Sequence, residues 1–504
     1  MEKPNLEELA TFCKKKGFVF QAAEIYGGLS GFFDFGPLGV ELKNNLKNSY
    51  WKHFVHKRED MAGQDGSIIT NPKVWKASGH IDNFADLVLT TKDTKTKLRA
   101  DHFIEDKLGI AGDGLTAEDI NALIKKHNLK FNDKEDFEEI KAFNLMFNTQ
   151  VGPSSETSSM AYLRPETCQS IFPNFKLISD VARAKLPFGI VQIGKAFRNE
   201  ISPRDFVFRC REFEQIEMEY FFNPETKCLM LSKNHENTKF QFLSAEEQEK
   251  DTNKIKEITI KELLKSKKIG EYHAYWLAEF FNWFSEMGLS FENMRVREHM
   301  KSELSHYSSA TFDIDYNFSH GFKEMFGLAY RGNYDLTQHQ THSKSKLEFF
   351  DEETKTKLLP HVIEPSLGVE RFFMAILTES FTFDKERENN VLKFNPIVAP
   401  YKVAVFPLMN KPELTKVARE IYEELIDEDI TAFYDKSGSV GKRYARQDEI
   451  GTPYCLTIDY ETIEEGKDKG TITIRDRDSM KQKRVKISEI AQTIKNLIKG
   501  KEKF

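Results

Sequence analysis

The sequence lacks three things that would each indicate a particular class of protein. It has no Cys-x-x-Cys pair, no apolar run of membrane-spanning length, and no apolar core in its N-terminal stretch MEKPNLEELATFCKKKGF. These absences argue against structural zinc, a membrane span and a secretory signal. The cysteines are few and scattered, which argues against a disulfide framework: Cys13, Cys168, Cys210, Cys228 and Cys455. We therefore expect a cytoplasmic protein with reduced, buried thiols and no membrane contact.

Length and charge set further bounds. The chain has 504 residues, of which 30% are charged and 39% hydrophobic, and this is enough for two or three domains with large cores. Its net charge is -6. That value does not exclude an RNA partner, because nucleic-acid binding needs a local basic track rather than an overall basic chain.

Residues 187–222 are the most informative stretch. They read PFGIVQIGKAFRNEISPRDFVFRCREFEQIEMEYFF, and their period-two alternation predicts two antiparallel strands joined by a turn around Pro203. Small and polar side chains from Gln192 to Glu200 share one face, and charged side chains of the returning strand follow the same alternation. We expect this hairpin to bury its apolar face and to offer charge on the other. The alternative is a solvated hairpin whose exposed face carries only ion pairs.

The spacing of the arginines and carboxylates favours a nucleotide site. The order Phe-Arg-x-Glu, a loop, then Arg-x-x-x-Phe-x-x-x-Glu resembles motif 2 of class II aminoacyl-tRNA synthetases. The resemblance implies that Arg198 binds the α-phosphate of ATP and the amino-acid carboxylate. It also implies that Glu200 and Arg209 hold the nucleotide and that Phe213 stacks on adenine. A guanidinium suits bidentate phosphate recognition, and an aromatic face suits base stacking.

The other two motifs of that class occur in the expected order. Residues 31–54 resemble motif 1, in which Pro37 can start a helix and apolar residues repeat every four positions: Leu38, Leu42, Leu46, Tyr50 and Phe54. This stripe predicts a buried helix face; an ordinary core helix would show it too, whereas in the family this segment forms the dimer interface. Residues 361–377 resemble motif 3, a strand feeding a helix, with Gly368 at the junction. The resemblance implies that Arg371 caps the adenine and meets the triphosphate.

Sequence words outside these motifs are similar to the glycyl-tRNA synthetase family over nearly the whole chain. They are EIYGGLSGFFDFGPLGVELKNN (24–45), KASGHIDNFADL (76–87), LRADH (98–102), YLRPET (162–167), SELSHY (302–307), YDLTQH (334–339) and KSGSVGKRYARQDEIGTPYCLTID (436–459).

The resemblance places two substrate sites on this chain. The glycine site falls on Arg99, Glu166, Phe213, Glu214, Gln215, Ile216, Glu217, Glu364, Pro365, Ser366, Leu367 and Gly368. The ATP site falls on Arg198, Asn199, Glu200, Phe208, Arg209, Phe213, Glu303, Leu304, Gly368, Val369, Glu370 and Arg371, with Glu303 a candidate ligand for Mg²⁺. Several carboxylates suit an ammonium group removed from water, although each one alone is more often a structural ion-pair partner. Since glycine has no side chain, selectivity has to come from exclusion, and an extra methyl group costs on the order of 1 to 3 kcal/mol.

Two segments depart from the family pattern. Where members commonly read Arg-Pro-Glu-Thr-Ala-Gln-Gly, this chain has Cys168 and Ser170 in place of the alanine and the last glycine. These small replacements affect the fine shape of the pocket. Residues 90–97 read TTKDTKTK where some members carry a cysteine pair, so we expect no zinc there.

We expect two domains. Residues 1–395 should form an α+β catalytic domain on an antiparallel sheet, with helical insertions at about 103–145 and 225–290. A stripe of Trp276, Phe280, Phe281 and Trp283 should lie in the core of the second insertion, and Thr116 should cap a helix of the first. Residues 396–504 alternate strands and helices, which predicts an α/β domain with a largely parallel sheet, similar to the anticodon-binding domain of several class II synthetases.

Basic residues of the C-terminal domain form two groups that we expect to bind RNA rather than to be ordinary charged surface: Lys442, Arg443 and Arg446 near Tyr444, and Arg475, Arg477, Lys481, Lys483 and Arg484.

The resemblance implies an ATP-dependent ligase that makes glycyl-adenylate and transfers glycine to tRNA(Gly). Its partners would be glycine, ATP with Mg²⁺, tRNA(Gly) and a second copy bound through the motif 1 helix. One rival is a noncatalytic synthetase-like binding module, which would lack the motif arginines. Another is a sister synthetase for threonine, proline or histidine. Arg198, Arg371, Glu166 and Glu303 are all present, which favours the enzyme.

Overall fold

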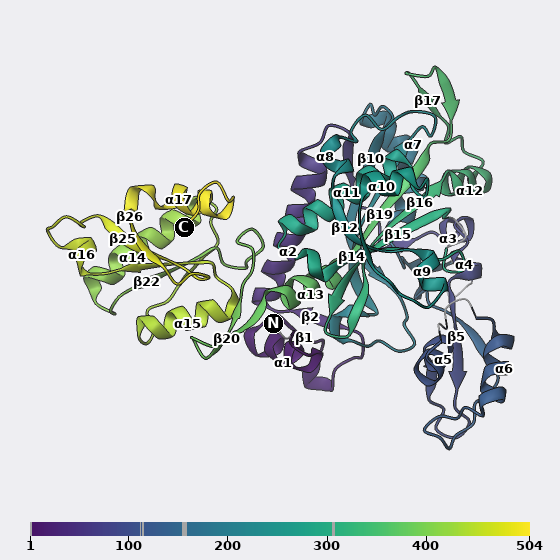
Figure 1. The fold of residues 1–504 in the computed structure, drawn as a ribbon, viewed down its shortest axis with the longest axis horizontal. Helices are drawn as coiled ribbons and strands as arrows, with labels where there is room; N and C mark the ends of the chain where they lie inside the picture. The colour runs from purple at the N-terminus through teal and green to yellow at the C-terminus, as the bar shows by residue number, and fades with distance from the viewer. Residues whose placement is uncertain (1–2, 111, 113–114, 154–158, 305–307) are drawn as a thin grey trace.

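The computed structural model describes residues 3–110, 112, 115–153, 159–304 and 308–504 (Figure 1). Residues 305–307 of the SELSHY word lie outside the described residues. Within the described part of the chain, no helix is both long and apolar enough to cross a membrane. All five cysteines are free and buried, as expected.

A nine-stranded sheet forms the centre of the larger body, with strand order β13-β12-β14-β15-β16-β19-β11-β10-β3 (Figure 1). Its strands are β3 (Met61–Gln64), β10 (Phe188–Phe197), β11 (Glu212–Phe222), β12 (Lys239–Leu243), β13 (Lys256–Thr259), β14 (Met294–Glu298), β15 (Ala310–Phe318), β16 (Gly321–Gly332) and β19 (His361–Gly368). Only the β10–β3 and β12–β14 pairs are parallel. The expected α+β fold on an antiparallel sheet is therefore confirmed.

The motif 2 hairpin has the expected register. Gln192 lies opposite Glu217, and Ala196 lies opposite Phe213. One part of the prediction is wrong, because the charged face is buried as well: Glu217 is 2% exposed and Glu219 is fully buried. The segment around Thr167 and Cys168 contacts this face, which forms the floor of a cavity rather than a solvated surface. The alternation of side chains alone could not reveal that cover.

The motif 1 helix α2 (Pro37–Trp51) begins at Pro37 as expected, and its whole apolar stripe is buried. The stripe packs inside its own chain against α11 (Glu271–Glu286) and α13 (Val369–Ser380), and the rings of Phe54 and Phe280 lie 4.3 Å apart. The predicted aromatic stripe of α11 is also buried. The apolar stripe of α2 therefore belongs to the core of the single chain, and a second copy could contact only other faces of this helix.

The remaining helices and short sheets surround this centre. The helices are α1 (Leu6–Lys16), α3 (Pro72–Ala77), α4 (His80–Asn83), α7 (Ile171–Val181), α8 (Lys233–Glu236), α9 (Ala245–Glu249), α10 (Ile260–Lys265) and α12 (Tyr334–Ser343). The short strands are β1 (Val19–Gln21) with β2 (Phe33–Phe35), β4 (Ile69–Thr70) with β9 (Met160–Leu163) and β8 (Asn148–Gln150), β17 (Phe349–Asp351) with β18 (Thr356–Leu358), and β20 (Phe381–Asp384) with β21 (Asn389–Leu392).

Neither predicted insertion is purely helical. The first belongs to a unit that begins before residue 103, in which α5 (Ala100–Leu108) and α6 (Ala117–His127) lie over the three-stranded sheet of β5 (Ala85–Thr90), β6 (Lys97–Arg99) and β7 (Lys141–Asn144). Figure 1 shows this unit projecting from the main body. Thr116 caps α6, as predicted. In the second, β12 and β13 extend the main sheet. The lysine-rich composition of the surrounding segment, residues 233–288, concealed these short strands.

The C-terminal unit has its own sheet and its own core (Figure 1). Its elements are β22 (Val403–Pro407), α14 (Pro412–Asp427), β23 (Ala432–Tyr434), α15 (Val440–Ile450), β24 (Tyr454–Ile458), α16 (Tyr460–Ile463), β25 (Thr471–Asp476), β26 (Gln482–Lys486) and α17 (Ile490–Ile498). The strand order is β23-β22-β24-β25-β26, in which the first three strands are parallel and the last two antiparallel. The expected α/β domain is present, but its sheet is mixed because a hairpin follows β24.

Candidate active site

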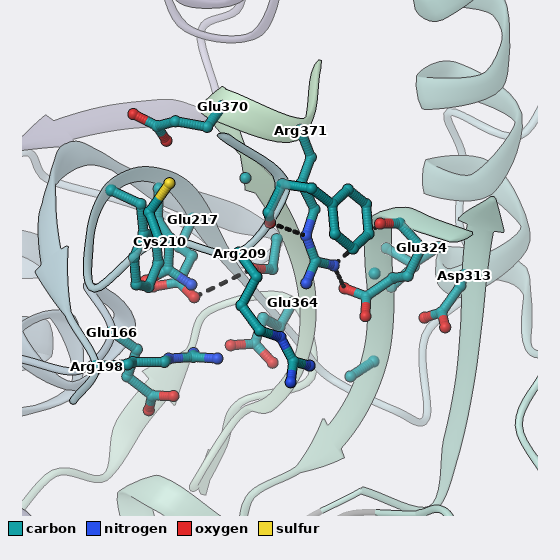
Figure 2. A pocket seen from close by; sticks show the side chains of 18 of the residues that line it. Glu166, Arg198, Arg209, Cys210, Glu217, Asp313, Glu324, Glu364, Glu370 and Arg371 are labelled. Atoms are coloured by element: carbon teal, nitrogen blue, oxygen red, sulfur yellow. Dashed lines mark hydrogen bonds and ion pairs between the residues drawn. The ribbon is translucent and has the colours of Figure 1, made fainter. Parts of the chain in front are cut away.

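A cavity of about 360 Å³ opens over the motif 2 hairpin (Figure 2). Its wall is built from β11, β15, β16, β19, the first turn of α13 and the loop between β10 and β11, which come from distant parts of the chain. Most of the predicted site residues line it: Glu166, Arg198, Glu200, Phe208, Arg209, Phe213, Gln215, Glu217, Glu364, Ser366, Gly368, Glu370 and Arg371.

The other predicted residues do not line the cavity: Arg99, Asn199, Glu214, Ile216, Glu303, Leu304, Pro365, Leu367 and Val369. Strand alternation explains several of them, since Ile216 and Leu367 point into the hydrophobic core. Glu214 points away from the cavity and pairs with Lys43 at 2.7 Å. The Arg99 guanidinium pairs with Asp101 at 2.6 Å. These side chains therefore lie outside the cavity lining.

Three buried carboxylates, those of Glu166, Glu217 and Glu364, lie close together and form the carboxylate end of the cavity. Glu217 Oε2 accepts hydrogen bonds from the backbone amides of Thr167 and Cys168 at 2.7 and 2.6 Å, and Glu217 Oε1 accepts from Ser366 Oγ at 3.1 Å. Burial and the nearby charge of Glu166 raise the pKa of Glu217. Fixed donors therefore set its orientation, while a cation brought into this end would stabilise its ionised form.

Two further carboxylates face the same space. Glu364 Oε2 accepts from Arg331 Nη1 at 2.8 Å, and burial raises the pKa of Glu364 to about 8. Glu166 Oε1 lies 3.1 Å from His80 Nε2. Burial alone would raise the pKa of Glu166, but the charge of His80 and its hydrogen bond hold that pKa well below its usual range. Glu219, fully buried on the same face of β11, has a pKa raised well above normal by burial and by Glu364.

Arginines lie among the carboxylates around the cavity, as Figure 2 shows, with Arg198 next to Glu166 and Arg371 next to Glu324. Arg198 is anchored by a hydrogen bond from Nε to the carbonyl of Pro165 at 2.9 Å, and its guanidinium lies 5.4 Å from the ring centroid of Phe213. Arg371 lies over the ring of Phe208 at 4.5 Å. The cavity thus offers guanidinium groups that suit an anionic ligand and carboxylates that suit an ammonium group.

The outer wall contains four cavity residues that the sequence analysis did not identify: His299, Thr311, Asp313 and Glu324. His299 Nε2 lies 2.6 Å from Asp313 Oδ2, and this hydrogen bond raises the pKa of His299 against the opposing effect of burial. Glu324 pairs with Arg371 at 3.2 Å. The period-two alternation of polar residues in β15 is the one sequence signal that could have identified this wall.

Oxygen ligands of the kind that Mg²⁺ prefers are available on this wall. Asp313 and Glu324 present carboxylates to the cavity. Glu303, the predicted candidate, instead accepts hydrogen bonds from Arg297 Nη1 at 3.1 Å and from the Met300 amide at 2.9 Å.

Three of the predicted RNA-binding arginines are buried, which corrects that prediction. Arg443 Nη1 donates to the carbonyl of Pro407 at 2.6 Å, Arg475 binds Asp448 at 2.8 Å, and Arg477 Nη2 donates to the carbonyl of Phe394 at 2.8 Å. They hold the C-terminal unit and its junction together. The exposed or half-exposed members of the two groups are Lys442, Arg446, Lys481, Lys483 and Arg484.

Comparisons with known proteins identify both parts of the chain. Residues 147–381 match the family model described as tRNA synthetase class II core domain (G, H, P, S and T), and residues 402–497 match the one described as anticodon binding domain.

Full-length relatives are also similar. The glycine–tRNA ligase of Ureaplasma urealyticum serovar 10 is 46% identical over 494 residues, covering 96% of this chain and 94% of that protein. The glycine–tRNA ligase of Borreliella burgdorferi is 42% identical, covering 99% of each. Among solved structures, prolyl-tRNA synthetase from Cryptosporidium parvum, complexed with L-proline and AMP, aligns with a TM-score of 0.56 at 14% identity, covering 99% of this chain and 76% of that one. That structure supports the fold.

Proposed function

The chain belongs to the glycine–tRNA ligase family, and we propose that it activates glycine with ATP and transfers the glycyl group to the 3′ end of tRNA(Gly) for protein synthesis. The observation that carries this proposal is that the arginines and carboxylates of the family motifs line one cavity. Arg198 and Arg371 would bind the phosphate and the carboxylate of the substrates, and Glu166, Glu217 and Glu364 would bind the ammonium group.

The first step needs no nucleophile from the protein. A carboxylate oxygen of glycine attacks the α-phosphorus of ATP, the bond to the bridging oxygen breaks, and pyrophosphate leaves with that electron pair. Arg198 orients the carboxylate and the α-phosphate, and Arg371 neutralises charge that develops on the phosphates. Phe213, beneath Arg198, offers a flat face for adenine.

In the second step a terminal ribose hydroxyl of the tRNA attacks the activated carbonyl, and AMP leaves. We propose Mg²⁺, rather than zinc, as the metal on the triphosphate; when bound, it neutralises phosphate charge. Asp313 and Glu324 would hold it, with Glu303 the candidate from family resemblance. Hard carboxylate oxygens and the absence of any Cys-x-x-Cys pair support this choice.

Selectivity for glycine follows from close packing at the carboxylate end. The ammonium group would sit among Glu166, Glu217 and Glu364, whose orientations are fixed by buried donors. A larger amino acid would have to push its side chain into this packed floor, and one methyl group already costs on the order of 1 to 3 kcal/mol.

We assign catalysis to residues 1–395 and anticodon recognition to residues 396–504. The separate hydrophobic core of the C-terminal unit and the family match at 402–497 support this division. The exposed basic residues Lys442, Arg446 and Lys481 are the proposed RNA contacts. We place the enzyme in the cytoplasm, in keeping with its free, buried thiols.

We also propose a homodimer. The apolar stripe of α2 is occupied by its own chain, so the contact would use other surfaces near this helix. Large apolar side chains are exposed just before it, including Ile25 at 88% and Tyr26 at 86%, and Val40 on α2 itself is 40% exposed. An exposed apolar cluster of this kind is typical of an interface. Sedimentation at micromolar concentration should give twice the mass of one chain, and Tyr26→Asp should weaken the dimer.

Aminoacylation of a tRNA(Gly) transcript tests the proposed function and separates it from both rivals. With purified protein and ATP, labelled glycine should appear on the tRNA, whereas threonine, proline and histidine should not. A noncatalytic binding module would charge nothing. A sister synthetase would charge another tRNA with its own amino acid and leave tRNA(Gly) uncharged.

A further inference from the structure

Two of the family-specific sequence words have no assigned role, yet both lead to the carboxylate end of the cavity. KASGHIDNFADL places His80 at the first position of α4, and YDLTQH places Asp335 in α12, just after Arg331 at the end of β16. His80 and Arg331 are buried, with exposed fractions of 6% and 2%. Neither is a member of the cavity lining.

His80 holds one oxygen of Glu166. Its Nε2 lies 3.1 Å from Glu166 Oε1, and its Nδ1 lies 2.8 Å from Ser78 Oγ. With a proton on Nε2 the ring donates to Glu166, and Nδ1 then accepts from the Ser78 hydroxyl in the neutral ring or donates to it in the charged ring, so both ring nitrogens are satisfied in either state. Cys168 Sγ adds a second donor to the same oxygen at 3.0 Å.

Arg331 holds one oxygen of Glu364 in the same way. Its Nη1 donates to Glu364 Oε2 at 2.8 Å, while Nε and Nη2 donate to the two oxygens of Asp335 at 2.7 and 2.8 Å. Asp335 is in turn held by Gln169 Nε2 at 2.8 Å. The guanidinium is thus fixed on several sides before it reaches the carboxylate.

The two contacts share a pattern. One oxygen of each carboxylate is taken by a buried donor, whereas Glu166 Oε2 and Glu364 Oε1 accept no hydrogen bond from any residue that the structure describes. A carboxylate has two acceptor oxygens, and fixing one of them fixes the direction of the other. The free oxygens are therefore available to a donor that enters the cavity.

We propose that His80 and Arg331 are positioning residues for the amino-acid ammonium group, each holding one carboxylate so that its second oxygen faces the substrate. The inference rests on the proposed function, because it takes the ligand at this end of the cavity to be the ammonium of glycine. It goes beyond the motif arginines and carboxylates, because it assigns a role to His80 and Arg331, which do not touch the substrate. A rigid pair of acceptors binds an ammonium more tightly than a mobile pair, since less side-chain freedom is lost on binding.

Two polar substitutions of the same histidine test the proposal. The amide nitrogen of His80→Gln reaches about as far as the ring Nε2, whereas that of His80→Asn is too short to contact Glu166. In glycine-dependent pyrophosphate exchange, His80→Asn should raise the KM for glycine about tenfold or more and leave the KM for ATP within about twofold. His80→Gln should recover most of the loss. Arg331→Lys keeps the positive charge but loses the planar guanidinium that donates to Glu364 and Asp335 together. It should likewise raise the KM for glycine and leave the KM for ATP within about twofold.

His235→Asn is the matched control. It breaks another histidine–glutamate hydrogen bond, between His235 Nε2 and Glu279 Oε1 at 2.7 Å, outside the cavity lining. Its KM for glycine should equal that of the wild type, and the melting temperatures of the two His80 variants should agree with each other. An unchanged KM for glycine in His80→Asn, or equal rises in both KM values, would overturn the inference. If the wild-type protein shows no glycine-dependent exchange, the proposed function itself fails. If the wild-type protein shows exchange and His80→Asn has an unchanged KM for glycine, only the positioning role is refuted.

Discussion

Glu166→Gln isolates the charge of one carboxylate at the end of the cavity. The substitution keeps the shape of the side chain, and the amide oxygen can still accept the hydrogen bond that His80 makes at 3.1 Å. The loss is confined to the negative charge that would face the ammonium of glycine. Because Glu166 is only 8% exposed, solvent can replace little of that interaction.

The magnitude follows from the burial of the pair. Removing one partner of a buried, hydrogen-bonded charge pair costs about 2 to 4 kcal/mol, which is roughly a 30- to 700-fold rise in the KM for glycine. One effect works against the loss. Glu166 contributes to the raised pKa of Glu364, so its neutralisation lets Glu364 ionise more readily. We therefore expect a value toward the lower end of this range.

Pyrophosphate exchange with glycine varied at saturating ATP, and then with ATP varied, measures both KM values. The KM for ATP should change little. Glu279→Gln is the control, since Glu279 also accepts a histidine hydrogen bond, from His235 at 2.7 Å, but lies outside the cavity lining. A parallel rise in the KM for ATP would mean that Glu166 holds the shape of the site, and unchanged glycine kinetics would remove it from the ammonium site.

Three further predictions follow from other contacts. Arg198→Ala should reduce glycine-dependent exchange by at least about 100-fold while circular dichroism stays unchanged, because a charge-assisted contact in the transition state is lost; near wild-type exchange would refute that role. Since burial raises the pKa of Glu364 from 4.5 to about 8, the KM for glycine should fall as pH rises toward about 8 and then level off, because the ammonium binds the ionised carboxylate. A glycine KM independent of pH would contradict the assignment. Between pH 4.5 and about 8 the folded state binds a proton at Glu364 that the unfolded state has lost, so the contribution of Glu364 to the free energy of unfolding should decrease as pH rises. Asp448→Asn should lower the free energy of unfolding by about 3 to 5 kcal/mol in urea titrations, since Arg475 at 2.8 Å and Arg387 at 3.0 Å lose their buried counter-charge; a loss under about 1 kcal/mol would show that water reaches these arginines.

The parts of the fold that sequence predicts best are those with regular periods. The period of two between Gln192 and Glu219 places the hairpin, and the four-residue repeat from Leu38 to Phe54 places a buried helix. Such patterns report which side of an element is apolar. They do not report what covers the polar side, and for this reason the buried carboxylates of β11 were expected to be exposed.

Charge is a weaker guide, because long-range partners decide where a charged side chain lies. Arg475 and Arg477 look like surface residues in the sequence, yet Asp448 and the carbonyls of Gly451 and Phe394 hold them in the interior. His80 and Arg331 likewise reach the cavity through tertiary contacts with Glu166 and Glu364. No local sequence pattern predicts such contacts, since the partners are distant in sequence.

Amino-acid-dependent pyrophosphate exchange, run separately with each of the twenty standard amino acids, tests the central claim most directly. It depends only on the cavity and on ATP, without any RNA. The account predicts exchange with glycine and at least about tenfold less with alanine, because one methyl group has to enter the packed floor among the carboxylates. Exchange that is faster with threonine, proline, histidine or any other amino acid than with glycine, or no exchange with any of them, would contradict it.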